Sequence, residues 1–457
     1  MEQSSRTEKF QRKRSQARRK NRRRLTTSAL VIAFFALASV LWLTYRGPDT
    51  GRSASPSTPP TDARPDPTGA ADTPKPAANK PGGAPSDSAN AGKTPSDSTG
   101  GKTPSGDAGG GKTGGSVPND GKNGSGGTAA PPSTPNPGGD GGDPNRVSLT
   151  FVGDVIFAQN VEAALKANGF DYPYKQVRSY LENADVTIAN LETPVTERGE
   201  AADKEYAYRS SPKALPAFKE AGFDIVNLAN NHILDYGTTG LLDTFDHLDK
   251  AGIRWFGAGR NAELAFKPVI VEKKGMKIAF LGFSKVVPTQ DWKAGKSRPG
   301  VADTYALPVP LEAIRNAKKQ ADLVVVVAHW GVERQDTPEK YQKDYARQYI
   351  DAGADLVVGG HPHVLQGFDH YNGKWIAYSL GNFIFTMNEN PKTWETVILQ
   401  ASCSKTDGCS LKAVPVLTKL ANPEPMGEEA ASKLFARLTD ISYGTEIGKD
   451  GTIRAKP

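Results

Sequence analysis

Short apolar runs and amphipathic stretches alternate along the C-terminal two-thirds of the chain, and each apolar run ends in polar residues. The run at 356–358 is followed by two glycines and then by His361-Pro362-His363. A short apolar run bounded by glycine is typical of a buried strand. Because open α/β sheets bind ligands at the carboxyl ends of their strands, we expect both imidazoles to lie at such an edge.

The same arrangement recurs at five other apolar runs, at 147–152, 186–189, 223–229, 323–328 and 375–380. The polar groups that follow them are, in order, Gly153-Asp154, Asn190-Leu191-Glu192, Asn230-Asn231-His232, His329-Trp330-Gly331 and Gly381-Asn382. Carboxylate, amide and imidazole side chains thus recur at equivalent positions. These are the ligand types of a hydrolytic metal centre.

Helical patterns separate the strands. Amphipathic spacing predicts helices at 160–168, 174–183, 238–250, 310–320, 336–351 and 428–438, with Asp336 capping the fifth and Pro338 in its first turn. A further strand is predicted at 276–282, and a hairpin at 396–402 and 410–416. The alternation predicts an α/β domain of about 300 residues with a partly parallel sheet. His247 lies within the third helix, away from any strand end, and is predicted to be a surface residue.

The N-terminal region has a different composition. Residues 1–24 carry 11 Lys and Arg against two Glu, whereas the whole chain has a net charge of only +7. Residues 25–45 carry no charge and are long enough, as a helix, to cross about 30 Å of hydrocarbon. The positive charge before this segment predicts a single-pass anchor in the lipid bilayer, with a cytoplasmic N-terminus and an extracellular C-terminal domain. A cleaved signal peptide is the alternative, although no small-residue cleavage site follows before Arg46.

The position of the basic tail favours anionic lipid over nucleic acid as its partner. Residues 46–146 are rich in Gly, Pro, Ser and Thr and are predicted to be a disordered tether, because they offer too little apolar surface to offset the entropy of folding. The folded domain is predicted at 147–447, with 448–457 as a frayed tail. The two cysteines, Cys403 and Cys409, flank an Asp-Gly turn signal, so they form either a small hairpin disulfide outside the cell or two free thiols.

The strand ends together supply the parts of a metal centre. The candidate ligands are Asp154, Glu192, Asn231, His329, His361 and His363. They are suited to one or two divalent ions (Mn, Fe or Zn), and His232 is placed to protonate a leaving oxygen. Any one of these residues is more often structural than catalytic, since Asp and Asn also cap turns and loops. Seven suitable residues at five strand ends favour the metal site.

The same residues resemble a known family. The motifs Gly153-Asp154, Asn190-Leu191-Glu192, Ala229-Asn230-Asn231-His232, Ala328-His329-Trp330-Gly331-Val332-Glu333, Gly360-His361-Pro362-His363 and Ser379-Leu380-Gly381-Asn382-Phe383 resemble the CapA-type poly-γ-glutamate capsule synthesis proteins of the calcineurin-like metallophosphoesterase superfamily. The resemblance implies an α/β fold that forms a four-layer sandwich, with two mixed β-sheets packed face to face and helices outside.

The resemblance also implies roles for individual residues. It makes Asp154 the first ligand and Glu192 the bridging carboxylate, with Asn231 and the later histidines as further ligands and His232 as the catalytic histidine. The family pattern usually has Asp-x-His at the first motif, but Val155-Ile156 follows Asp154 here. One metal position therefore lacks a ligand, while Glu192, Asn231, His329 and His361 complete the other.

Other residues are predicted more loosely. Trp330 and Glu333 either line the cleft or support a ligand, as does Asn382, and Arg209 either pairs with an anionic substrate or lies on the surface. The resemblance predicts a role in the synthesis, export or attachment of an anionic capsule polymer, poly-γ-glutamate, with a metal-dependent hydrolase or transfer site. The alternative is a non-catalytic subunit that binds the polymer and helps assemble a membrane-embedded synthase.

Overall fold

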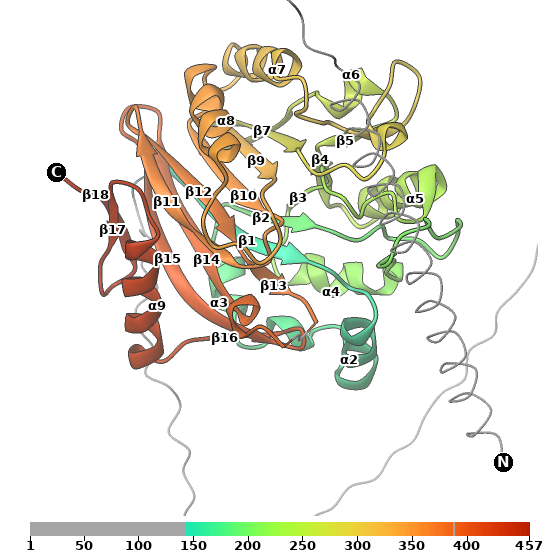
Figure 1. The fold of residues 1–457 in the computed structure, drawn as a ribbon, viewed down its shortest axis with the longest axis horizontal. Coiled ribbons are helices and arrows are strands. Elements are labelled where there is room, and N and C mark those ends of the chain that lie inside the picture. Colours follow the sequence, from blue (N-terminus) through green and yellow to red (C-terminus); the bar gives the residue numbers. More distant parts are fainter. Residues whose placement is uncertain (1–142, 144, 387–388) are drawn as a thin grey trace, which may run out of the picture. The chain divides into compact units, whose positions relative to one another are not determined.

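Two mixed β-sheets form the centre of the fold (Figure 1). The computed structural model describes residues 143, 145–386 and 389–457. The larger sheet has, in spatial order, β17 (Thr445–Ile447), β18 (Thr452–Ala455), β15 (Gly408–Lys419), β14 (Glu395–Ser404), β1 (Arg146–Val155), β2 (Val186–Leu191), β3 (Ile225–Asn227) and β4 (Arg254–Phe256), with β13 (Asn382–Ile384) beside β1 and β16 (Asn422–Pro425) beside β15.

The smaller sheet has, in spatial order, β11 (Leu365–Tyr371), β12 (Lys374–Leu380), β10 (Leu356–Gly360), β9 (Leu323–His329), β7 (Met276–Ser284) and β6 (Val269–Lys273). β5 (Ala258–Gly259) and β8 (Gly300–Val301) form a separate pair. Strands β1 to β4 run parallel in the larger sheet, and β7, β9, β10 and β12 run parallel in the smaller one. Antiparallel β14, β6 and β11 make both sheets mixed.

The facing surfaces of the two sheets enclose one apolar core. Leu149 and Phe151 of β1 pack with Phe280 of β7, Val325 of β9 and Val358 of β10 in a single buried cluster. Side chains alternate between the two faces of a strand, so the remaining residues of these strands point outward and need their own cover. The apolar runs of the parallel strands are buried on both faces for this reason.

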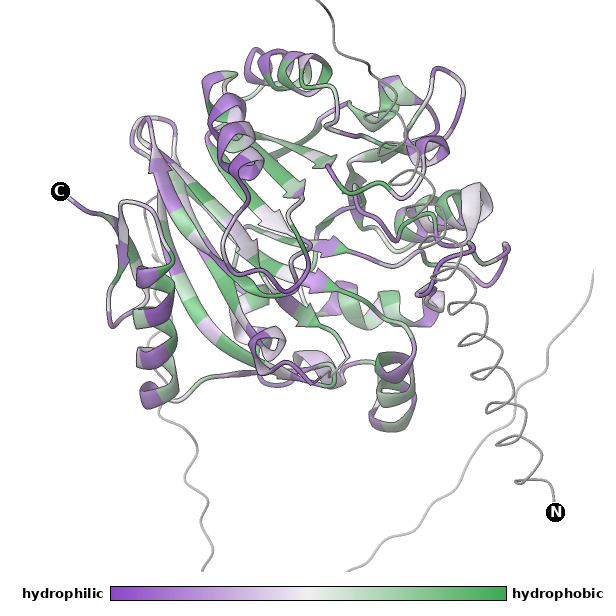
Figure 2. Ribbon diagram, in the orientation of Figure 1, coloured by the Kyte–Doolittle hydropathy of each residue, from purple (hydrophilic) through white to green (hydrophobic). Residues whose placement is uncertain are grey.

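Helices supply that cover on both outer faces. The outer face of the larger sheet shares a core with α2 (Asn160–Asn168), α3 (Arg178–Glu182), α4 (Leu215–Glu220) and α5 (Gly237–Lys250). The smaller sheet is covered by α6 (Ala262–Ala265), α7 (Pro308–Lys318) and α8 (Lys340–Asp351), and α9 (Glu428–Asp440) extends the core between the sheets. Hydrophilic residues predominate on α8 and on the outward side of α9 (Figure 2). The predicted four-layer α/β sandwich is confirmed.

Short 3-10 helices connect some of these elements. They are η1 (Tyr172–Tyr174), η2 (Pro212–Ala214), η3 (Gln290–Trp292) and η4 (Pro391–Trp394). The helix predicted at 174–183 is therefore divided into η1 and α3. The two cysteines face each other across β14 and β15 and form a disulfide, which closes the predicted hairpin.

Two predicted segments are wrong in detail. The helix predicted from Asp336 begins only at Lys340, because the backbone N–H of Glu339 donates to the Gln342 side chain in a capping box, while Asp336 pairs with Lys392. The tail predicted to fray contains β18, which pairs with β15 and β17. The predicted basic tail, anchor and tether lie outside the described residues. Within the described ranges, no helix is long and apolar enough to cross a membrane.

Candidate metal centre

Five of the six predicted ligands lie together where β1, β2, β9 and β10 end. Ligand atoms of Asp154, Glu192 and His329 all lie within 4.8 Å of one another, and the same holds for Glu192, His361 and His363. All five residues are buried. Asn231 joins them from the loop after β3, since its Oδ1 lies 2.6 Å from His329 Nε2. The structure thus gathers every predicted ligand into one cluster.

The backbone around β10 makes this convergence possible. A Cβ atom at Gly360 would lie 2.6 Å from Asp154 Oδ1, so only glycine lets the carboxylate approach the strand. His361 and His363 have φ angles of +95° and +56°, which are uncommon for residues other than glycine. Such conformations cost about 1–3 kcal/mol each and cluster at functional sites. The chain therefore keeps two strained residues where both imidazoles enter the cluster.

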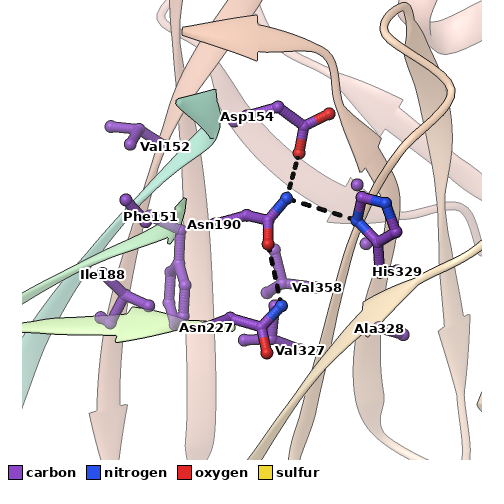
Figure 3. A pocket seen from close by; sticks show the side chains of 14 residues that line it. Phe151, Val152, Asp154, Ile188, Asn190, Asn227, Val327, Ala328, His329 and Val358 are labelled. Atoms are coloured by element: carbon purple, nitrogen blue, oxygen red, sulfur yellow. Dashed lines mark hydrogen bonds between the residues drawn. The ribbon is translucent and has the colours of Figure 1, made fainter. Parts of the chain in front are cut away.

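A chain of amide side chains supports Asp154 from below (Figure 3). Asn190 Nδ2 donates to Asp154 Oδ1 at 2.8 Å and lies 3.3 Å from His329 Nδ1, while Asn190 Oδ1 accepts from Asn227 Nδ2 at 2.9 Å. Neither Asn190 nor Asn227 was assigned a role from the sequence. The available signal was an asparagine in each of two short, fully buried strands, β2 and β3.

His363 is held in place by Asn382. Its Nδ1 lies 2.9 Å from Asn382 Oδ1 and 3.3 Å from Asp154 Oδ2, and Asn382 Nδ2 donates to the His363 carbonyl at 3.2 Å. Burial opposes protonation of His363, but the charges of Glu192 and Asp154 outweigh it and raise the pKa of His363 to about 9. Asn382 thus occupies the supporting position that the sequence suggested.

The pKa of the neighbouring Asp154 carboxyl is lowered, in contrast to that of His363. Burial alone would raise the pKa of Asp154, but its hydrogen bond and charge interaction with His363, together with the charge of His329, leave the pKa below its ordinary value. Asp154 is therefore held as a carboxylate beside an imidazolium when no cation is present.

Two buried atoms in the cluster have no hydrogen-bond partner among the described residues. They are Glu192 Oε1 and His361 Nδ1. Burial and the nearby imidazoles hold the pKa of His361 well below its ordinary value, so its ring is neutral and its nitrogen lone pair is available. An unsatisfied buried polar atom costs about 1–3 kcal/mol. Carboxylate oxygen and imidazole nitrogen are donors to first-row divalent cations, so the residues present fit such an ion.

The first motif offers no histidine. Ile156 occupies the position where the family pattern usually has one, and it packs in a small apolar cluster with Ala158 and Phe385. Ile156 is 4% exposed, so this cluster fills the space around it. The first motif therefore supplies one donor, Asp154, where the family pattern supplies two.

His232 is fixed by contacts that the sequence analysis did not predict. Its Nδ1 lies 2.7 Å from Asp235 Oδ2 and 3.1 Å from Lys204 Nζ, and its ring lies 4.7 Å from the ring of Tyr208. The carboxylate also accepts hydrogen bonds from Lys204 Nζ and from the backbone N–H of Tyr208. These contacts leave Nε2 as the ring nitrogen not engaged by Asp235. The signal for Asp235 was its spacing of three residues from His232, whereas nothing local pointed to Lys204.

Trp330 does not line the cleft. It is 0% exposed, its indole N–H donates to the Tyr378 carbonyl at 3.0 Å, and its ring stacks at 6.2 Å on Tyr349 in the outer core of the smaller sheet. Because side chains alternate along an extended backbone, the residue after His329 points to the opposite face. Of the two roles predicted for Trp330, lining the cleft is wrong, and only indirect support of a ligand remains.

Glu333 and Arg209 are exposed. Glu333 lies close enough to the cluster for its charge to contribute to the raised pKa of His363. The guanidinium of Arg209 lies 4.7 Å from the ring centroid of Tyr236, which places it on a surface aromatic residue. This position matches the surface alternative for Arg209.

Comparison with known proteins gives the chain a family. The family model described as "Bacterial capsule synthesis protein PGA_cap" matches residues 148–387, more than half of the chain. The chain belongs to this family. The match to PGA_cap includes every candidate ligand, His232 and Asn382.

Curated relatives point the same way. The chain is 36% identical over 313 residues to the capsule biosynthesis protein CapA of Bacillus anthracis, covering 65% of this chain and 74% of the relative. It is 35% identical to the PGA biosynthesis protein CapA of Bacillus subtilis, covering 66% and 81%. It is 34% identical to a probable polyglutamine synthesis accessory protein of Mycobacterium tuberculosis, covering 53% and 75%.

Solved structures are more distant from this PGA_cap member. A 5'-nucleotidase from Candida albicans aligns with a TM-score of 0.34 and 16% identity, covering 58% of this chain and 51% of that one. A sulfate thiohydrolase SoxB from Thermus thermophilus aligns with a TM-score of 0.35 and 13% identity, covering 64% and 60%. The four-layer assignment rests on the two sheets and the helices outside them.

Proposed function

We propose that this chain acts outside the cell in the synthesis, export or attachment of an anionic capsule polymer, through a divalent metal centre. The observation that carries the proposal is the pair of unsatisfied buried atoms, Glu192 Oε1 and His361 Nδ1, inside a cluster of ligand-type side chains. The names of the relatives, capsule and PGA biosynthesis proteins, support poly-γ-glutamate as the polymer.

Glu192, Asn231, His329 and His361 would hold one ion, and Asp154 and His363, with Glu192 shared, would hold a second one more weakly. A bound cation would polarise the oxygen of an amide or phosphoester and lower the pKa of a water molecule or acceptor group. The number of donors favours one firmly bound Mn, Fe or Zn ion.

The protein's own acid–base group is His232. Its Nε2 would deliver a proton to the leaving nitrogen or oxygen, while Asp235 at 2.7 Å holds the other ring nitrogen and sets the orientation of the ring. Tyr208 covers one side of the imidazole. Lys204 pairs with Asp235 at 2.6 Å and so helps to fix the carboxylate that orients His232.

Residues 25–45 and 46–146 would serve as bilayer anchor and tether. Both segments lie outside the described residues, so this part of the proposal depends on the charge pattern of the N-terminal region alone. It puts the metal centre on the side of the membrane where a capsule polymer emerges.

A second function is favoured by one observation. Ile156 fills the position of the missing first-motif ligand with an apolar side chain, as expected of a subunit that has kept the fold for binding polymer and assembling a synthase. A His232→Ala variant separates the two functions. The scaffold function predicts that capsule production survives this substitution while deletion of residues 147–447 abolishes production.

The deciding experiment is elemental analysis of the purified full-length protein. We expect about one or two divalent ions per chain in the wild type, and loss of the ion in His361→Ala. His370→Ala is the matched control, because His370 lies on β11 against Trp375, with ring centroids 4.4 Å apart, and is not part of the cluster. A wild-type protein that binds no metal after reconstitution would overturn the metal-centre proposal.

A further inference from the structure

A small apolar cluster lies beside the metal centre, separate from the three larger cores of the described residues. Three buried residues form it: Ile156, Ala158 and Phe385. The half-buried Tyr208 packs against this cluster. The ring centroid of Phe385 lies 4.8 Å from that of His363, and the ring centroid of Tyr208 lies 4.7 Å from that of His232. The cluster and Tyr208 therefore border both a candidate ligand and the candidate general acid.

Aromatic rings continue from Tyr208 to the surface. The ring centroid of Tyr206 lies 6.3 Å from that of Tyr208, which itself lies against the His232 ring. Exposure rises along this series, because His232 is 6% exposed, Tyr208 is half-buried and Tyr206 is 53% exposed. We call Tyr206 and Tyr208 the tyrosine platform. The platform leads from the imidazole that would protonate a leaving group out to solvent.

Packing within the protein does not explain the outer ring of the platform. Tyr206 belongs to none of the apolar clusters of the described residues. Val332, on the loop after β9, is also exposed, at 47%, and it precedes Glu333, whose charge acts on both Tyr206 and His363. Exposed apolar side chains that adjoin a buried polar site are typical of a ligand-binding surface.

The charges around the platform are mixed. Glu205 raises the pKa of Tyr206 through a hydrogen bond with its hydroxyl and through its negative charge, Glu333 adds to this shift, and Arg334 opposes it. Since both signs of charge are present, attraction of an anion is not what the platform offers. Its rings offer an apolar surface, which suits the uncharged part of a chain.

We infer that the tyrosine platform is a subsite for the backbone of a γ-linked glutamyl chain, on the leaving-group side of the bond that the metal centre attacks. The inference rests on the proposed function and extends it from the metal centre to the neighbouring stretch of substrate. Each residue of such a chain contributes methylene groups and an amide to the backbone, and both can pack on the face of a tyrosine ring. The side of the chain follows from His232, which touches Tyr208.

The test measures binding of a γ-linked glutamate oligomer to the metal-loaded, full-length protein. We expect Tyr206→Ala to weaken affinity about tenfold, the effect of losing one aromatic contact, equally at low and high salt because apolar contacts are not screened. Tyr206→Phe should retain most of the affinity, since packing needs the ring and not the hydroxyl. Metal content and circular dichroism of each variant check that the fold is intact.

Tyr305→Ala is the matched control for this test. Tyr305 is 45% exposed, and its ring lies 4.2 Å from Lys285 Nζ and 4.1 Å from Lys293 Nζ, neither of which belongs to the metal centre. We expect Tyr305→Ala to bind the oligomer like the wild type. A loss as large as that of Tyr206→Ala would overturn the platform as a specific subsite.

The other outcomes separate the subsite from the proposed function. Equal oligomer affinity of wild type and Tyr206→Ala overturns the subsite and leaves the metal centre standing. A metal-loaded wild type that does not bind the oligomer overturns both the subsite and the choice of polymer. If Tyr206→Ala weakens binding of adenosine monophosphate but not of the oligomer, the platform stacks on an aromatic base and the subsite is wrong. A loss seen only at low salt would mean a charge contact and would also overturn it.

Discussion

The two ends of β10 differ in whether their buried polar side chains have hydrogen-bond partners. Before the strand, the carboxylate of Asp355 accepts hydrogen bonds from Lys318 Nζ at 2.7 Å, Lys374 Nζ at 2.8 Å and the Val324 backbone N–H at 2.9 Å. After the strand, His361 Nδ1 is buried without any partner among the described residues. One end is satisfied by the protein alone, and the other is not.

The side chains at the two ends of β10 also differ in their exposure to solvent. The lysines that pair with Asp355 are 40% and 32% exposed, so water shares in their solvation. Glu192 is 0% exposed and His361 4% exposed. Charged side chains gather at both ends of the strand, so clustering alone does not mark a functional site. Clustering combined with burial and missing partners does, because native proteins rarely leave such groups unsatisfied without a ligand or a task. Tyr174 Oη and Arg437 Nη1 are also buried without a partner, but neither residue belongs to a group of metal-ligand side chains among the described residues.

The largest expected effect follows if chemistry occurs at one end only. We expect His232→Asn to lower turnover of the polymer by about 10²- to 10⁴-fold, the usual contribution of a general acid, with unchanged metal content. Asp355→Asn, at the other end, should leave turnover unchanged. The comparison breaks if Asp355→Asn lowers turnover as much as His232→Asn, and unchanged turnover in His232→Asn favours the scaffold function.

Metal removal tests the difference between the two ends of β10 through the free energy of unfolding. A chelator should lower the free energy of unfolding by about 3 kcal/mol when the free ion was at a hundredfold excess over its Kd. Asp355→Asn should lower the free energy of unfolding by about 1–2 kcal/mol, and equally with and without chelator. Urea unfolding of both proteins in both conditions checks this. A chelator that leaves the wild-type curve unmoved would contradict the distinction.

The clustering of the candidate ligands could be predicted from the sequence for a simple physical reason. Parallel strands of one sheet deliver their carboxyl ends to one edge, so the residues after β1 and β2 lie together, as do those after β9 and β10. The face-to-face packing of the two sheets then brings the two edges together. The order of the strand-end motifs therefore predicted the α/β domain and the cluster of side chains, whereas the four-layer sandwich was predicted from the family resemblance. Short strands such as β4 and β18 were missed, because three or four residues carry too little alternation to be recognised.

Supporting residues were harder to predict, since their roles depend on tertiary contacts. Lys204 reaches His232 from a loop whose path is set by Asp235, which accepts from both Lys204 and the backbone of Tyr208. Trp330 follows a ligand directly but points to the other face of the sheet, into the core. The position of Lys204 cannot be read from residue type and spacing alone, whereas alternation along the strand is enough to place Trp330 on the face opposite His329.

The smallest expected effect concerns Asp185, another satisfied carboxylate, just before β2 at the amino ends of the parallel strands. It accepts hydrogen bonds from Ser148 N and Oγ at 2.8 and 2.9 Å and from Lys274 Nζ at 2.8 Å. Burial would raise the pKa of Asp185, but these bonds hold it below the ordinary value of 3.8. A lowered carboxyl pKa contributes stability that is present above the unfolded value and is lost as pH falls through the folded value.

Asp185→Asn should therefore reduce the free energy of unfolding near neutral pH by about 1 kcal/mol, a modest value because Lys274 is 41% exposed and its charge is screened by solvent. The difference between variant and wild type should shrink as the pH is lowered from about 7 to about 3, where the wild-type carboxylate begins to be protonated in both states. Urea unfolding across this range measures it. If the difference in free energy of unfolding stays unchanged at the acid end, Asp185 acts through shape and hydrogen bonding rather than charge. The contrast between paired charges at the amino ends of the strands and unpartnered atoms at their carboxyl ends would then rest on Asp355 alone.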